Sequence, residues 1–204
     1  MNRFMLVWMM ILLSGCSIQQ MMSDAYDVKG GPGYVERNIS EFDDVVTVKM
    51  EPAYLTMDYS YFKVGVYRSS RMKPGEVWLE AQLKGAVNFD FDLPMKARLG
   101  SEMLVFKPVS RSDSGSVSNH YVHSSGPFSI PVDMGLVTRK YFRASVSDLK
   151  KLAKSKNPIF RVFTFDGYVE EKAGPADNYA SSFEAYPHAW FTGGIPRFLA
   201  MAGL

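Results

Sequence analysis

The stretch 61-YFKVGVYRSSRMKPGEVWLEAQL-83 decides the fold of this 204-residue chain. Apolar and polar side chains alternate on both sides of a Lys-Pro-Gly turn signal at residues 73–75. Because successive side chains of a strand point to opposite faces of its sheet, this alternation predicts two half-buried antiparallel strands. The side chains expected on their core-facing sides are Phe62, Val64 and Val66 in the first strand and Val77, Leu79, Ala81 and Leu83 in the second.

The same periodicity continues on both sides of this hairpin. Residues 45–50 (VVTVKM) predict a strand before it, and residues 86–93 (AVNFDFDL) predict one after it. Turn signals at Lys84-Gly85 and Leu99-Gly100 separate the strands at short intervals, as a meander requires. Further strands are expected at residues 103–108, 121–123, 128–132, 137–144 and, on either side of an Asp-Gly turn, within 159–171.

Two segments follow a helical pattern instead. In residues 145–158 either Ser145 or Ser147 can cap a helix that carries Asp148 in its first turn, and Pro158 is expected to end it. A short C-terminal helix is expected from Gly194, with Pro196 near its start. Together these patterns predict a mainly β (α+β) fold, an antiparallel sheet or β-sandwich with one inserted helix and a short C-terminal helix.

Composition is consistent with one substantial hydrophobic core. Hydrophobic residues make up 47% of the chain and aromatic residues 14%, while the formal net charge is only +2. The near-neutral charge argues against a dedicated nucleic-acid-binding protein. The chain has a single cysteine, Cys16, so an internal disulfide is excluded.

The N-terminus has the three-part pattern of an export signal. Arg3 supplies the positive charge, residues 4–13 are apolar, and the small residues Ser14 and Gly15 precede Cys16. The apolar run is too short to span a bilayer, which takes about 20 residues. It therefore predicts a cleavable signal peptide.

The residues Leu13-Ser14-Gly15-Cys16 resemble the lipobox of bacterial lipoproteins. The resemblance implies that the signal is cut between Gly15 and Cys16 and that acyl chains, such as palmitate, are attached at Cys16. Two or more chains are needed for stable anchoring. Ser17, which follows the cysteine, implies the outer membrane in a Gram-negative host, with the domain in the bacterial envelope or periplasm. The alternative is a secreted protein that is cut near Gly15 and keeps an unmodified Cys16.

The sequence therefore divides into three parts: a signal peptide (1–15), a lipidated N-terminus with a flexible tether (16–44), and one β-rich domain (45–204). The tether is expected because residues 17–44 contain a Gly-Gly-Pro-Gly stretch and few branched apolar residues.

A cluster of basic residues is the first candidate binding surface. Only one acidic residue, Asp148, interrupts the basic residues between positions 139 and 161. Such a cluster can contact anionic lipid, an acidic protein or a polysaccharide; the alternative is a solvated helix face. The candidate residues are Arg139, Lys140, Arg143, Lys150, Lys151, Lys154 and Lys156.

An aromatic segment, 183-FEAYPHAWF-191, is the second candidate surface. Tyr186, His188 and Trp190 can form a platform that stacks on a sugar or peptide. The alternative is that they cover one end of the core.

No catalytic or metal site is expected. His120 and His123 would point to opposite faces of an extended segment, and zinc sites need further ligands. Asp90 and Asp92 share a predicted strand face but are also typical of a wet sheet surface. The sequence thus predicts a membrane-anchored, non-catalytic binding or scaffold module without cofactor or nucleic-acid partner. An envelope hydrolase or modifying enzyme with a dispersed site is the alternative.

Overall fold

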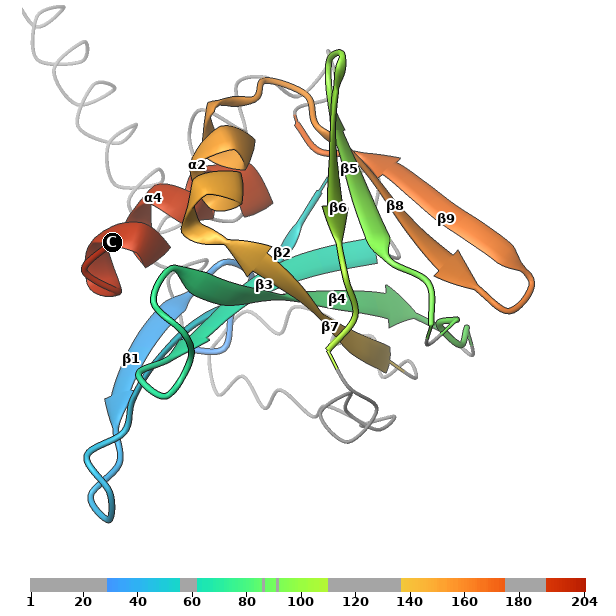
Figure 1. The fold of residues 1–204 in the computed structure, drawn as a ribbon. Helices are drawn as coiled ribbons and strands as arrows, with labels where there is room; N and C mark the ends of the chain where they lie inside the picture. The colour runs from blue at the N-terminus through green and yellow to red at the C-terminus, as the bar shows by residue number, and fades with distance from the viewer. Residues whose placement is uncertain (1–28, 56–61, 86, 91, 110–136, 175–189) are drawn as a thin grey trace, which may run out of the picture.

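A computed structural model describes residues 29–55, 62–85, 87–90, 92–109, 137–174 and 190–204. These residues form two antiparallel sheets and two helices, which confirms the expected mainly β fold class (Figure 1). The first sheet has the strand order β1-β2-β3-β4-β7, and the second has the order β6-β5-β8-β9. The first sheet contains β1 (Val35–Ile39), β2 (Val46–Tyr54), β3 (Phe62–Ser69), β4 (Glu76–Lys84) and β7 (Val137–Ser145).

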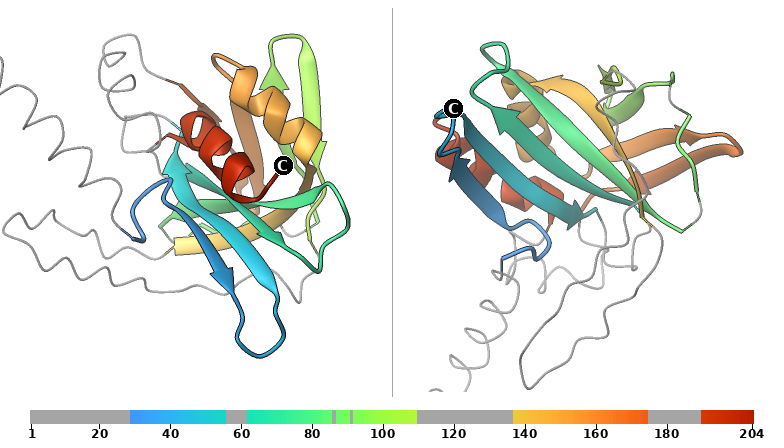
Figure 2. Two further views of the ribbon diagram at one scale, coloured as in Figure 1. Left: turned by 90° about the vertical axis from the view of Figure 1, so that its left-hand side faces the viewer. Right: turned by 90° about the horizontal axis from the view of Figure 1, so that it is seen from below.

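The second sheet stands at a steep angle to the first, on the side that the helices cover (Figures 1 and 2). The chain passes from one sheet to the other beyond β6, where Pro108 forms a bridge with Phe142 of β7 and the Val109 N–H donates to the Tyr141 carbonyl. The elements on this side are β5 (Met95–Leu99), β6 (Glu102–Phe106), β8 (Ile159–Thr164), β9 (Gly167–Lys172), α2 (Val146–Lys154) and α4 (Phe191–Met201).

The core lies between the two sheets and beneath the helices. Phe160 of β8 meets Phe191 of α4 edge to face with ring centroids 5.4 Å apart, and Phe89 meets Phe142 in the same way at 6.4 Å. All side chains that the alternation in residues 61–83 places inward are buried. The hairpin that decided the fold is confirmed as β3 and β4, which pair in register from Phe62↔Leu83 to Tyr67↔Trp78.

The helix that follows β7 is confirmed, and its cap is Ser145. The Ser145 hydroxyl accepts the Asp148 N–H at 3.1 Å, and the Asp148 carboxylate accepts the Ser145 N–H at 2.9 Å. This reciprocal capping box satisfies two backbone donors at the start of α2. The helix ends at Lys154, before the expected Pro158, because the backbone of Ser155 is extended; its N–H still bonds to the carbonyls of the last turn.

The flexible tether was expected to extend to residue 44, but its C-terminal part belongs to the folded domain. Residues 35–39 form β1, which pairs along its whole length with β2, and the Gly33 N–H donates to the Glu51 carbonyl. Only Val35 of this edge strand is buried, so its sequence lacks the alternation that marks the other strands.

The strand expected at residues 86–93 is also corrected. Its described residues form only a single bridge, between Phe89 and Thr164, and the next strand, β5, begins at Met95. Two carbonyls of the segment, those of Asp90 and Leu93, accept hydrogen bonds from the Lys140 ammonium, and the Asp92 N–H bonds to the Asp90 side chain. The described residues of the segment keep two backbone bonds to β8 and the residue that follows it, from the Asp90 N–H to the Phe163 carbonyl and from the Phe165 N–H to the Asn88 carbonyl, and side-chain bonds hold the rest.

Helix α4 begins three residues earlier than expected. The Gly194 N–H donates to the Trp190 carbonyl at 2.9 Å, so Gly193 and Gly194 continue the helix, and Pro196 lies inside it. In the described ranges neither helix has the length and apolar composition needed to cross a bilayer. The predicted signal peptide, Gly15, Cys16 and the strands expected at 121–123 and 128–132 lie outside the described residues.

Candidate functional site

The basic residues that cluster in the sequence are spread over several surfaces in space. Lys140 is 1% exposed and points into the core, so its prediction as a surface residue is wrong. Acidic residues from other elements accompany three more: Glu80 beside Arg139, Glu76 beside Arg143, and Glu102 beside Lys151. Exposed lysines without an ion pair to a described residue remain on and just after α2: Lys150, Lys154 and Lys156.

The aromatic platform has one member among the described residues. Trp190 is only 5% exposed and precedes α4, where it forms a bridge with Tyr54 and lies 6.4 Å from that ring. It therefore covers one end of the core, which is the alternative that the sequence left open. Tyr186 and His188 lie outside the described residues, as do His120 and His123.

Lys140 is a buried ammonium that holds the segment before β5. Its Nζ donates to the Asp90 carbonyl at 2.5 Å and to the Leu93 carbonyl at 3.1 Å, and it lies 4.9 Å from the centre of the Phe142 ring. Burial lowers the pKa of Lys140 to about 8, while the carboxylates of Asp90 and Asp92 act in the opposite direction. Asp90 and Asp92 thus accompany a structural lysine. The prediction that they share a strand face is wrong, because the described residues of this segment form only a single bridge.

The face of the first sheet that points away from the helices carries a buried carboxylate. Glu80 is fully buried, with Gln82 Nε2 at 3.0 Å, Arg139 Nε at 3.5 Å and Lys49 Nζ at 3.8 Å from its oxygens. Burial, followed by the charge of Glu80, raises the pKa of Tyr141. Glu51, 2.9 Å from Lys49, supplies a second carboxylate, so two acids and two cations balance one another in this cluster.

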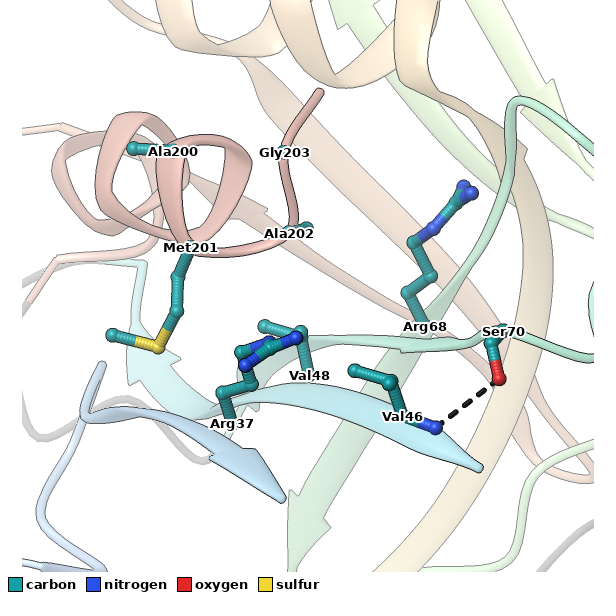
Figure 3. Close-up of a pocket in the computed structure, with 9 residues that line it drawn as sticks. All are labelled: Arg37, Val46, Val48, Arg68, Ser70, Ala200, Met201, Ala202 and Gly203. Atoms are coloured by element: carbon teal, nitrogen blue, oxygen red, sulfur yellow. Dashed lines mark hydrogen bonds between the residues drawn. The ribbon is translucent and has the colours of Figure 1, made fainter. Parts of the chain in front are cut away.

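An open groove of about 350 Å³ lies between the first sheet and the end of α4 (Figure 3). Val48 of β2 pairs with Arg37 of β1 on one side and with Arg68 of β3 on the other, so the three side chains share one row of the sheet. Figure 3 shows Arg37 and Arg68 rising from the sheet beside the last turn of α4. The remaining lining residues are Val46, Ser70, Ala200, Met201, Ala202 and Gly203.

The groove lining contains Arg37 and Arg68 but no acidic residue to match their charge. Arg68 uses Nη1 to donate to the Glu76 carbonyl at 3.1 Å, and neither arginine forms an ion pair with a described residue. The N–H groups of Ala202, Gly203 and Leu204 donate to the carbonyls of Phe198, Ala200 and Leu199, which closes the last turn of α4 beside the groove. Two guanidinium groups above an apolar floor of Val46, Val48 and Met201 can bind an anionic group that carries an apolar portion.

The sequence held a signal for one of these arginines. Arg68 continues the inward row of Phe62, Val64 and Val66 at the same spacing of two, so alternation alone places it on the helix-covered face. Arg37 gave no such signal, because it lies in the edge strand β1 whose pattern is polar.

Among the described residues no group of three or more His, Cys, Asp or Glu side chains could hold a metal ion. Comparison with known proteins gives no matching family model, no similar curated protein and no similar solved structure.

Proposed function

We propose that this protein is a lipid-anchored binding module of the bacterial envelope, and two separate features support this. The lipobox-like residues 13–16 support the anchor. The row Arg37–Val48–Arg68 supports the binding function, because it places two cations on one apolar groove without a carboxylate partner among the described residues. The second observation carries the proposal that the module binds a ligand.

The groove suits a partner protein that presents an acidic side chain beside small apolar residues. Arginine binds carboxylates in a two-pronged geometry that lysine cannot reproduce. The small residues Ala200, Ala202 and Gly203 leave room at the helix end for the apolar part of such a partner. Because Arg37 lies on the edge strand β1 and is exposed, a partner can reach it from solvent.

The binding proposal is tested by photo-crosslinking in cells. A photoreactive residue replaces Ala200, which is exposed at the groove. We expect a discrete crosslinked product that disappears in the variant Arg37→Gln/Arg68→Gln and persists in the control Lys150→Gln/Lys154→Gln, which removes two charges from α2. A product that is indifferent to both arginines would contradict the assignment of the groove.

The anchor is tested separately. We expect incorporation of labelled palmitate into the wild-type chain and none into Cys16→Ala, which should also leave the membrane fraction. Labelling that survives in Cys16→Ala would refute attachment at this cysteine without affecting the groove.

A further inference from the structure

The outward face of the second sheet combines unmatched positive charge with exposed apolar side chains. Register places Met103, Arg98, Ile159 and Lys172 in one row across β6, β5, β8 and β9, and Val105, Lys96, Arg161 and Glu170 in the next. Phe163 and Tyr168 pair in a third row. We call these ten residues the docking face.

The docking face carries a formal charge of +3, from four cations and the single carboxylate of Glu170. Arg161 already pairs with Glu170 at 2.5 Å and lies 4.4 Å from the centre of the Tyr168 ring. Lys96, Arg98 and Lys172 have no ion pair with a described residue. One further carboxylate, Asp166, lies in the turn beyond the face. The outward face of the first sheet is different, because Glu51 and Glu80 there balance the charges of Lys49 and Arg139.

Apolar side chains lie beside the cations in the first two rows and make up the third. Met103 is 51% exposed, Val105 54% and Tyr168 60%, although each belongs to a regular strand. Phe163 is partly buried, with Lys96 Nζ 5.5 Å from its ring centre. Cations beside exposed aromatic and aliphatic groups are the chemistry that binds the headgroup region of an anionic bilayer.

The dimensions favour a membrane over a protein partner. Four strands spaced by about 4.8 Å, with five residues each at about 3.4 Å, give a face of roughly 300 Å². Stable protein interfaces bury about 800 Å² of accessible surface on each partner, so a stable protein partner would have to extend well beyond this face. A bilayer needs no such area, because each cation near an anionic surface contributes separately.

We infer that the docking face rests on an anionic membrane surface. The second sheet lies at the end of the molecule opposite β1 and the last turn of α4 (Figures 1 and 2). Docking by this face therefore leaves the Arg37–Arg68 groove accessible. The inference depends neither on lipid attachment at Cys16 nor on the occupant of the groove.

A fluorescent label at Met103 tests the inference in the full chain. Cys16→Ser is made in every variant, so that the introduced Met103→Cys provides the only thiol and lipid attachment plays no part. Phosphatidylcholine vesicles, with or without phosphatidylglycerol, contain a headgroup quencher. We expect quenching at position 103 only with phosphatidylglycerol, and none for a label at Lys73→Cys in the turn before β4.

Two matched charge variants decide which surface docks. Lys96→Gln/Arg98→Gln/Lys172→Gln should lower the docking equilibrium constant about 100-fold, because each cation contributes a factor of roughly five. Lys150→Gln/Lys154→Gln/Lys156→Gln removes the same charge from the region of α2 and should change it less than about 5-fold. The inference would be overturned by equal quenching at positions 103 and 73 or by a larger loss of docking in the α2 variant. It would also be overturned by the absence of quenching at position 103, which would instead favour an acidic protein as the partner of this face.

Discussion

The Glu80 carboxylate lies 3.5 Å from the Arg139 guanidinium across β4 and β7, and the two side chains are 1% and 17% exposed. Lys49, at 3.8 Å on the other side, is 32% exposed. The acid is thus sealed in, whereas both cations retain some access to water. This difference makes the network asymmetric, because an unpaired cation can move towards solvent and the carboxylate cannot.

We predict that Arg139→Leu is more damaging than Glu80→Leu. Removing one partner of a buried ion pair costs about 3 kcal/mol when the remaining charge stays buried, whereas replacing the buried charge itself by an apolar side chain costs less. Urea unfolding measures both values. The double variant should resemble Glu80→Leu, since it leaves no buried carboxylate, and equal costs for the two single variants would contradict the asymmetry.

The cap of α2 gives a prediction with a built-in control. Ser145→Ala should lower the free energy of unfolding by about 1 kcal/mol, because it removes the acceptor of the Asp148 N–H. Ser147→Ala, two residues later, removes a hydroxyl that makes no cap and should change stability by less than about 0.5 kcal/mol. Thermal or urea unfolding distinguishes them, and a larger effect at Ser147 would place the cap there instead.

Sequence periodicity predicted the elements whose faces are chemically distinct. Strands β3, β4 and β7 alternate along most of their length, and α2 has both an apolar stripe and a cap. The edge strand β1 was missed because it buries only Val35, and residues 86–93 were misassigned although they alternate well. Their carbonyls bond to Lys140, fifty residues from Asp90 in the chain, and no local pattern reports such a contact.

The candidate sites likewise depend on long-range contacts that no local sequence pattern reports. The basic cluster was identified by counting charges along the chain, but Glu76, Glu80 and Glu102 accompany three of its members only after folding. The docking face and the groove arise from strand register, which brings Arg37 and Arg68 to either side of Val48. Register depends on long-range pairing, so neither surface could be assembled from sequence alone.

We expect substitution of Gly65 to destabilise the protein, because the backbone of β2 passes close to its Cα. An added Cβ would lie 2.7 Å from the Met50 carbonyl oxygen and 3.2 Å from Pro52 Cδ, beside the register shift in β2. Gly65→Ala should therefore cost about 1–3 kcal/mol in unfolding experiments. Adding Pro52→Ala removes only the ring contact and should restore a minor part; full restoration would show that the Met50 carbonyl can move away.

The lowered pKa of the buried Lys140 ammonium leads us to expect that the protein becomes more stable as the pH rises. Burial lowers its pKa from 10.5 to about 8 in the folded protein. Between these values the unfolded chain binds a proton that the folded chain does not, so the free energy of unfolding increases with pH. Lys63, whose pKa is also lowered by burial, acts in the same direction. Tyr141 acts oppositely, because its pKa is raised, but only above its ordinary value of about 10.

The test is urea unfolding between pH about 8 and about 9, where tyrosine in the unfolded chain is still mostly protonated. Wild-type protein should become more stable across this range, and Lys140→Met should retain only the smaller rise due to Lys63. Lys154→Gln, which removes an exposed lysine, should keep the wild-type slope. Since Lys140→Met also leaves the Asp90 and Leu93 carbonyls without their ammonium donor, the variant should be less stable at every pH in the range. An unchanged slope in Lys140→Met would mean that this ammonium keeps its proton throughout, despite its burial between the two sheets.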